Sequence, residues 1–544
     1  MLLLAPILLI SLCLLPNNSA NRGPKQLAAL VSFCLALVLA DLVLHSALWL
    51  TQPGGYSGSL LEAVLGNTPG VYVDGLAGTM AVLIGFIGWI IIRYSVPYLE
   101  GDPQHGRFIK WLGFTLGSVL LMVLSSNLVI LAGAWMLISL GLHKLLTHYP
   151  HRKAGRIAAM KKFAYSRLGD AFVISAIVLI YLSYGTLSYD QLFQQTSANP
   201  QAGWMGSAIA ILLALGALTK SAQFPFHTWL PDTMETPTPV SALMHAGIIN
   251  GGGFLLIRLS PLVSVSSAAL NSLTIVGAFT AVLAAVVMLC QTSVKRKLAY
   301  STVAQMGFMI MQCGLGAFAA ALLHIVAHSL YKSYAFLSAG GVAAEIARPS
   351  ELRPQTATNY SAIGRLVSSG LAGCIVGGLI TGATFWLTGL LDKFAVQTVL
   401  LPLALSLALA HFIASAVYSA KAAVIIRTVG LGMLAGLAYC VSYLLFDSIL
   451  HAGGASSGAV AVTSPIVIGL VCVTLVATAA VFGLMPIIRK SQKMRNLYIH
   501  ASSGFYVDVV MARLTQRLLP RPALATVSTT YAQSTTSTWE NLCG

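Results

Sequence analysis

The chain has 544 residues, of which 57% are hydrophobic and only 8% are charged. Because soluble globular proteins carry about 25% charged residues, this composition excludes a water-soluble enzyme and indicates a chain that lies mostly in a lipid bilayer. The formal net charge of +16 fits basic loops that face an anionic membrane surface, and we expect no nucleic-acid partner.

Apolar stretches of nearly the length that spans ~30 Å of hydrocarbon recur along the chain. They predict an all-α, polytopic membrane protein of about fifteen transmembrane helices, at 1–15, 27–50, 75–97, 109–125, 127–147, 163–185, 205–226, 239–260, 268–290, 299–314, 316–341, 364–391, 394–420, 428–450 and 464–488. Residues 1–15 lack a preceding basic segment, so we interpret them as a first helix and not as a signal peptide.

The loop charges predict the orientation of these helices. Alternate loops, near 51–73, 186–204, 261–268 and 451–463, contain no Lys or Arg. The intervening loops are basic, among them 144–162 and 490–495. The positive-inside rule then predicts an outside N-terminus and a cytoplasmic C-terminus in a bacterial inner membrane.

The C-terminal region differs from the rest of the chain. Residues 497–519 are amphipathic if helical, with Val507, Val510, Leu514 and Leu518 on one side and Asp508, Arg513, Gln516 and Arg517 mostly on the other. This pattern suits a helix that lies at the membrane surface or docks a partner. We expect the Ser/Thr-rich remainder to be disordered.

Ionisable side chains in the middle of spanning helices are functional candidates, because each costs roughly 2.5–3.5 kcal/mol on insertion scales. Lys220 lies more than ten residues after Gly206 in an apolar stretch. We interpret it as a proton-relay residue, with a structural pairing as the alternative.

A proline-rich segment follows Lys220 and contains Pro231, Pro237 and Pro239. Prolines interrupt helices, and broken helices are where transporters gather their ion sites. We therefore predict a site at His245 after the last of these prolines, with Asp232 and Glu235 at the cytoplasmic mouth.

His324, His328 and Lys332 are spaced i, i+4, i+8, so they lie on one helix face and are candidates for a hydrogen-bonded proton wire. Asp392 with Lys393, and Arg167 with Asp170, are further candidates, although an ion pair can be structural. We expect no metal site and no cofactor, since the cysteines stand apart and no acid completes the histidine pair.

The segment LTKSAQFPFHTWLPDTMETPTPVSALMHAG, together with VDGLAGTM, KRKLAYSTVAQMGFM and HIVAHSLYKSYAFLSAG, closely resembles the antiporter-like subunits of respiratory complex I and of Mrp antiporters. The resemblance covers roughly residues 70–400. It implies two inverted five-helix repeats, each with a broken helix, and a midplane proton path through the positions that match Lys220, His245, His324, His328, Lys332 and Lys393.

The resemblance divides the chain into five parts. They are N-terminal transmembrane helices (1–100), a first repeat (101–260), a second repeat (261–427), C-terminal transmembrane helices (428–489), and a cytoplasmic amphipathic segment with a disordered tail (490–544).

One departure from the family is large. The family has a glutamate on its fifth helix as the partner of the lysine that Lys220 matches, whereas this chain has Met136 there. No Asp or Glu occurs from Pro103 to Gly169, so Asp170 is the nearest substitute in sequence.

This departure and the short C-terminus resemble the DabB type of membrane subunit in two-component inorganic-carbon accumulation systems. The resemblance implies a non-enzymatic, proton- or Na+-conducting subunit with a large cytoplasmic DabA-like partner similar to a zinc β-carbonic anhydrase. The alternatives are an ion-pumping subunit of a complex I-like NADH:quinone oxidoreductase, a Mrp-type Na+/H+ antiporter component, and a purely structural scaffold.

Overall fold

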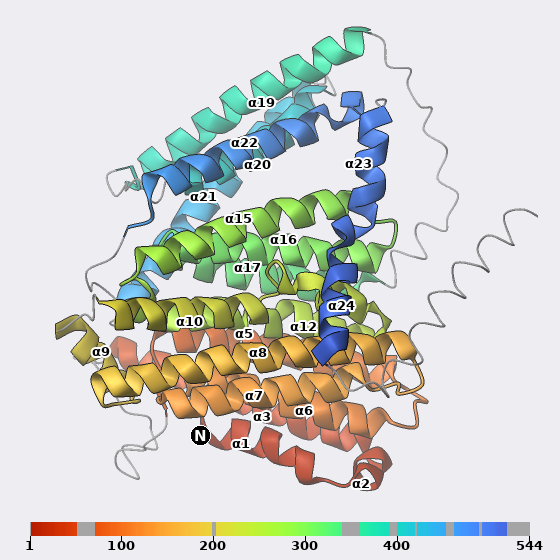
Figure 1. The fold of residues 1–544 in the computed structure, drawn as a ribbon, viewed down its shortest axis with the longest axis vertical. Coiled ribbons are helices and arrows are strands. Elements are labelled where there is room, and N and C mark those ends of the chain that lie inside the picture. The colour runs from red at the N-terminus through yellow and green to blue at the C-terminus, as the bar shows by residue number, and fades with distance from the viewer. Residues whose placement is uncertain are drawn as a thin grey trace, which may run out of the picture.

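A computed structural model of the chain describes residues 2–51, 71–198, 203–339, 360–391, 400–418, 422–452, 462–488 and 492–518. Within these ranges the regular structure is helical, apart from two isolated antiparallel bridges, Val71 with Ser125 and Asn127 with Ser188. The all-α prediction is therefore confirmed. Most long helices run alongside one another in stacked layers, from the N-terminal helices at the bottom of Figure 1 to α19–α22 at its top.

The first half of the bundle runs from the N-terminus to residue 263. Its elements are α1 (Leu4–Ser11), α2 (Asn17–Arg22), α3 (Pro24–Thr51), α5 (Gly75–Tyr98), α6 (His105–Leu124), α7 (Leu128–Leu146), α8 (Lys153–Tyr184), α9 (Tyr189–Ala198), α10 (Trp204–Lys220), α11 (Trp229–Asp232), α12 (Thr238–Ala246), α13 (Gly251–Arg258) and α14 (Ser260–Val263).

The second half continues the same packing. Its elements are α15 (Ser267–Leu289), α16 (Val294–Gly314), α17 (Phe318–Leu337), α19 (Tyr360–Leu387), α20 (Leu400–Tyr418), α21 (Ala422–Ala452), α22 (Pro465–Ile488), α23 (Gln492–Ser502) and α24 (Val507–Leu518). The pairs α15 with α16 and α19 with α20 pack closely along their lengths.

Glycines explain the close approach of α15 and α16. A Cβ added to Gly277 would lie 2.5 Å from the backbone nitrogen of Met311, and one added to Gly307 would lie 2.6 Å from that of Ala281. Both distances are shorter than real Cβ contacts, so the two backbones touch at a spacing that any larger side chain would prevent.

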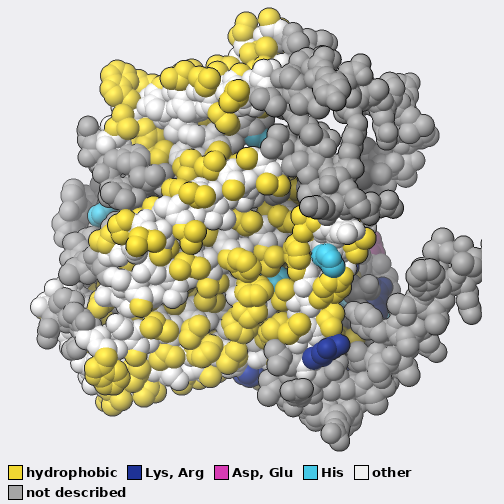
Figure 2. Space-filling view, turned by 45° about the horizontal axis from the view of Figure 1, so that its top comes forward, with side chains coloured by type: hydrophobic (Ala, Val, Ile, Leu, Met, Phe, Trp, Pro, Cys, Tyr) yellow, Lys and Arg dark blue, Asp and Glu magenta, His cyan; other side chains and the backbone are white. Residues whose placement is uncertain are grey.

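One face of the bundle is largely apolar (Figure 2). Figure 2 shows a face covered by hydrophobic side chains, with Lys and Arg confined to its edge. Among the described helices, nine combine the length and apolarity needed to cross a bilayer. Each of the fifteen predicted stretches overlaps a helix of the structure, although several of these helices are shorter or more polar than a typical span, and the count of fifteen spans stays a prediction.

The first predicted span is interrupted. Helix α1 ends at Ser11, and the chain then forms a short 3-10 turn, Leu12–Leu14, before Pro16. The hydrophobic run therefore contains eight α-helical residues, fewer than the ~20 that cross a bilayer. Leu15 is extended (ψ 128°), as expected for the residue before a proline, so the chain does not return to helix before Pro16.

The prediction that residues 144–162 form a basic loop is wrong at its C-terminal end. Helix α8 begins at Lys153, ten residues before the predicted helix start, and runs for 32 residues. The extra turns contain alanine and lysine, which favour helix, and no proline. As a consequence, Lys161 and Lys162 lie on a helix and are largely buried.

Two helices, α23 and α24, run across the ends of the others (Figure 1). They form the predicted amphipathic region, divided at Phe505, whose φ is +52°. Phe505 and Met511 pack against the core, whereas Val510 is 56% exposed. Of the predicted apolar side, Val510 thus points away from the protein, and α24 contacts the bundle through Asp508 and Met511.

Candidate functional site

Two helix interruptions meet in the centre of the bundle. Helix α10 ends at Lys220, and the backbone leaves the helical path at Ala222, whose φ is +48°. The chain resumes as a 3-10 turn at Phe226–Thr228. Pro237 precedes α12 and Pro239 lies in its first turn, where a backbone N–H would have no partner within the helix. The prolines thus begin a new helix and do not break one internally.

The second interruption follows His245. Between α12 and α13 the chain forms a 3-10 turn at Ile248–Asn250. The Ser221 hydroxyl donates to the carbonyl oxygen of Ile249 at 2.8 Å, which satisfies an acceptor near the break. A Cβ on Gly252 would lie 2.5 Å from the oxygen of Ala217, so glycine is required where α13 touches α10.

Lys220 is enclosed by this arrangement. Its side chain is buried, its Nζ donates to the carbonyl oxygen of Trp135 at 3.2 Å, and it lies 4.2 Å from the centre of the Trp135 indole ring. A backbone carbonyl and an aromatic face both stabilise a cation without neutralising it. The side chain thus lies inside the bundle and not in the lipid-facing surface.

Asp170 is the only candidate carboxylate that the described structure places near Lys220, and it forms its ion pair elsewhere. Its Oδ2 lies 2.6 Å from Nη2 of Arg167, whose side chain is 44% exposed. The carboxylate is buried, and apart from this ion pair neither oxygen accepts a hydrogen bond of good geometry from the described residues. Asp170 still influences Lys220 electrostatically, so the sequence-based substitute lies near the lysine without binding it.

His245 and helix α17 form the second part of the site. The His245 ring is fully buried, stacks on Phe336 at 4.3 Å, and has no hydrogen-bond partner at either ring nitrogen among the described residues. His328 Nε2 lies 3.2 Å from the backbone oxygen of His245. Buried polar groups are nearly always satisfied, so these nitrogens are suited to bind water or a moving proton.

The three predicted residues of α17 lie on one face. The rings of His324 and His328 stack at 5.9 Å. Lys332 is 1% exposed and donates to the hydroxyl of Ser301 and, at 3.3 Å, to the oxygen of Leu298. The three side chains therefore lie along one face of α17, as their spacing predicts. The role of this stripe in proton transfer stays a prediction.

A polar link joins the two parts. The Asn250 amide donates to the Ser329 hydroxyl of α17 and to the oxygen of Ala246, each at 2.8 Å. The next residue, Gly251, lies against Lys220, since an added Cβ would be 3.6 Å from its side-chain carbons. The second helix interruption therefore connects the surroundings of Lys220 to the face of α17.

Asp232 belongs to a charged cluster at the end of the bundle crossed by α24. Lys161 Nζ lies 2.7 Å from Asp232 and 2.5 Å from Asp508. The segment is also held by the Gln291 amide, which donates to the oxygen of Ser502 at 3.3 Å. A lysine with two carboxylates thus fastens the C-terminal helix beside Asp232.

Replacing Asp508 with asparagine is expected to loosen this C-terminal segment. The change removes one charge-assisted contact, which contributes ~1 kcal/mol when partly exposed. Trypsin cleavage within residues 492–518 of the solubilised protein should become about fivefold faster. Unchanged cleavage, with Asp447→Asn as the control, would show that Asp508 does not hold the segment.

Three of the predicted site residues cannot be placed. Asp392 and Lys393 lie outside the described residues, and so does the side chain of Glu235. Conversely, the structure brings Lys162 to the site, whereas the sequence predicts that it lies in the basic loop 144–162. Its spacing from Asp170, eight residues along a helix, is the signal that would have placed both on one face.

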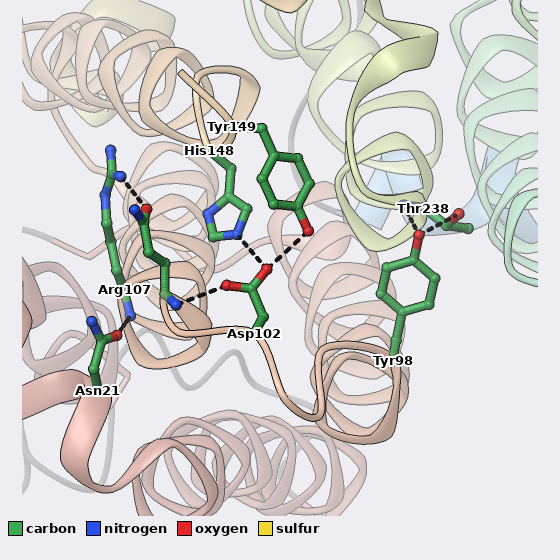
Figure 3. A network of polar contacts seen from close by, with 8 residues as sticks. Asn21, Tyr98, Asp102, Arg107, His148, Tyr149 and Thr238 are labelled. Atoms are coloured by element: carbon green, nitrogen blue, oxygen red, sulfur yellow. Dashed lines mark hydrogen bonds and ion pairs between the residues drawn. The ribbon is translucent and has the colours of Figure 1, made fainter. Parts of the chain in front are cut away.

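A second cluster of polar contacts lies near the start of α12 (Figure 3). The Asp102 carboxylate accepts from the Tyr149 hydroxyl at 2.9 Å and lies 3.5 Å from His148 Nε2. The Tyr98 hydroxyl is 3.4 Å from the backbone nitrogen of Thr238, at the start of α12. Asp102 thus joins the loop after α5 to the loop after α7, and Tyr98 at the end of α5 contacts the start of α12.

Burial and hydrogen bonding shift the pKa values in this cluster. Burial lowers the pKa of the His148 imidazole, and Asp102 opposes this only in part. Burial alone would raise the pKa of the Asp102 carboxyl, but the Gln104 N–H, Tyr149 and His148 together hold it below its ordinary value. Burial and the bond to Asp102 raise the pKa of Tyr149 to about 12.

These shifts predict a pH dependence of stability. The unfolded chain protonates His148 near its ordinary pKa of ~6.5, whereas the native state resists protonation, so stability should fall as the pH drops below that value. His148→Gln should lose less stability than the wild type between about pH 7.5 and 5.5. Parallel thermal-unfolding profiles of the two proteins would refute this role of His148.

Comparisons with known proteins decide the family. The membrane-region model of the NADH:quinone oxidoreductase/Mrp antiporter family matches residues 125–396, and the model of the N-terminus of complex I chain 5 matches 65–109. A probable inorganic carbon transporter subunit, DabB2 of Halothiobacillus neapolitanus, is 33% identical over 530 residues, covering 96% of this chain and 94% of that one. The chain belongs to this family of antiporter-like, proton-conducting membrane subunits.

Other relatives cover less of the chain. A probable inorganic carbon transporter subunit DabB of Hydrogenovibrio crunogenus is 41% identical over 62% of this chain and 63% of its own length. The NADH-quinone oxidoreductase subunit L of Mycobacterium tuberculosis is 37% identical over 50% of this chain and 43% of its own. These alignments thus span less than two thirds of either relative.

The fold agrees with the family. A solved Mrp complex from Dietzia sp. superposes with a TM-score of 0.60 at 24% identity, covering 99% of this chain and 59% of that one. The predicted resemblance to complex I and Mrp subunits is therefore confirmed.

Proposed function

We propose that the chain is the ion-conducting membrane subunit of an inorganic-carbon transporter in a bacterial inner membrane. A proton or Na+ gradient would drive uptake of CO2 or bicarbonate by a cytoplasmic partner that resembles a zinc β-carbonic anhydrase. The observation that carries this proposal is the likeness to DabB2 of Halothiobacillus neapolitanus over nearly the full length of both chains.

The buried titratable groups support the conducting role. Lys220, His245 and the α17 stripe lie inside the bundle, and Asn250 and Gly251 lie between them. In this proposal the proton passes between these side chains, and Asp232 with Glu235 forms the cytoplasmic mouth. Asp392 and Lys393, which lie outside the described residues, are further candidates for this path from the sequence alone.

The energy of the gradient is sufficient for the proposed work. One charge that crosses ~100 mV releases about 2.3 kcal/mol, and each tenfold accumulation costs about 1.4 kcal/mol. One charge per carbon therefore supports a concentration ratio of roughly fortyfold.

The test is growth in ambient air. A host that lacks carbonic anhydrase and needs added CO2 would express this chain with its partner, each protein alone, or neither. We expect growth only when both proteins are expressed together. In those cells a protonophore should abolish the accumulation of labelled inorganic carbon. Growth restored by the partner alone would show that this chain does not supply the driving force.

A redox-driven pump is the second candidate, because complex I subunit L of Mycobacterium tuberculosis is also similar. Its similarity is limited to half of this chain. Proton pumping on addition of NADH to membranes that contain the chain, without carbon uptake, would favour this candidate.

A further inference from the structure

Lys162 is a buried lysine that the path described so far does not use. It lies on α8, is 4% exposed, and donates from Nζ to the carbonyl oxygen of Ser139 at 2.9 Å. Lys220 makes the same kind of bond to Trp135. Ser139 and Trp135 are one turn apart on α7, so both lysines approach the helix that carries Met136.

The two lysines line one cavity. Their side chains, with those of Tyr165, Ser166 and Thr219, surround a space that holds about one water molecule. Each is close enough to Asp170 to feel its charge, and the charge of Lys220 also acts on Lys162. Two ammonium groups that line one small cavity repel each other. The arrangement therefore favours the state in which one of the two lysines is protonated over the state in which both are.

A polar route leads from this cavity toward the Lys161–Asp232 cluster. The Tyr165 hydroxyl lies 3.2 Å from Oγ1 of Thr228, in the turn that precedes Asp232. The charges of Lys161 and Asp232 also act on the Tyr165 hydroxyl. Lys162 therefore stands between the central lysine and the end of the bundle that α24 crosses.

We propose that Lys162 is a proton-carrying partner of Lys220 and fills the role left open by Met136. The ammonium of Lys220 gives a proton to a water in the cavity, and that water gives a proton to the neutral amine of Lys162. Lys162 then releases its proton toward Tyr165 and the proposed cytoplasmic mouth at Asp232. This inference rests on the proposed function, because it adds a step to the same proton path.

A purely structural Lys162 would only tie α8 to Ser139. Lys162→Arg separates the two roles, since a guanidinium keeps the charge and the hydrogen bond but does not release its proton. Lys110→Met is the matched control: Lys110 is also buried and donates to a backbone carbonyl, that of Leu15 at 2.9 Å, away from the cavity.

The experiment measures proton flux in vesicles that contain the full chain and its partner under an imposed pH gradient. We expect Lys162→Arg and Lys162→Met each to reduce flux by about a hundredfold, as the loss of a positioned proton carrier does. Combining Lys162→Met with Lys220→Met should reduce flux no further, because the two act in series. Lys110→Met should retain flux within about twofold, even if it melts earlier.

The outcomes distinguish this inference from the proposed function. Wild-type flux in Lys162→Arg, with flux lost in Lys220→Met, would overturn the role of Lys162 and leave the path through Lys220 intact. Wild-type flux in Lys220→Met would overturn the path itself. Flux lost in Lys162→Arg while its melting temperature is retained supports the inference.

Discussion

Replacing Lys220 with methionine is expected to abolish gradient-driven carbon uptake without unfolding the protein. The side chain is buried and makes one hydrogen bond, to the oxygen of Trp135. Methionine has a similar volume and carries no charge to desolvate, and Lys220 has no ion-pair partner among the described residues that the change would leave unpaired. Uptake of labelled inorganic carbon should fall about a hundredfold because no proton carrier remains at this point.

Lys220→Arg provides the control for this prediction. Arginine keeps the positive charge and can contact the Trp135 ring, but it does not deprotonate in proteins. We expect it to be inactive as well. Uptake at the wild-type rate in Lys220→Arg would show that Lys220 supplies only a fixed charge. Uptake at the wild-type rate in Lys220→Met would show that Lys220 is not part of the proton path.

Breaking the Arg258–Asp74 pair should produce the largest loss of stability. Arg258 Nη1 and Nη2 donate to the two oxygens of Asp74 at 2.6 and 3.0 Å, and the side chains are 2% and 8% exposed. Asp74 also accepts from Ala77 at the start of α5. Asp74→Asn leaves a buried guanidinium without its counter-charge, which costs about 3–5 kcal/mol.

The measurement is thermal unfolding of the solubilised protein. The double variant Asp74→Asn with Arg258→Met removes both charges and should recover part of the loss. The exposed pair of Lys25 with Glu100, whose side chains are 71% and 68% exposed, is the control, and Lys25→Ala should change stability by less than about 1 kcal/mol. Equal effects of the buried and exposed variants would contradict this account.

The sequence predicted the helices better than their contacts. The expected helix at 75–97 is α5, Gly75–Tyr98, and the expected helix at 268–290 is α15, Ser267–Leu289. Long apolar runs define such helices without help from the rest of the fold. Helix α8 was placed less well, because charged residues in its first turns have the composition of a loop.

The missed parts of the site depend on contacts between distant residues. Lys161 and Asp508 are 347 positions apart, so no local pattern connects them. Lys162 was hidden for a related reason: its charge fits the positive-inside rule, and only the packing of α8 on α7 shows that the side chain is buried. The spacing of His324, His328 and Lys332 is local, and this stripe was accordingly predictable.

The central claim is that ion movement through these buried side chains drives carbon accumulation. The most direct test records internal pH and labelled inorganic carbon together in vesicles that contain the chain and its partner, while the imposed gradient is varied. The account predicts that carbon accumulation follows the gradient and disappears when a protonophore or a Na+ ionophore collapses it. Accumulation that continues with no gradient and no ion movement would contradict the account.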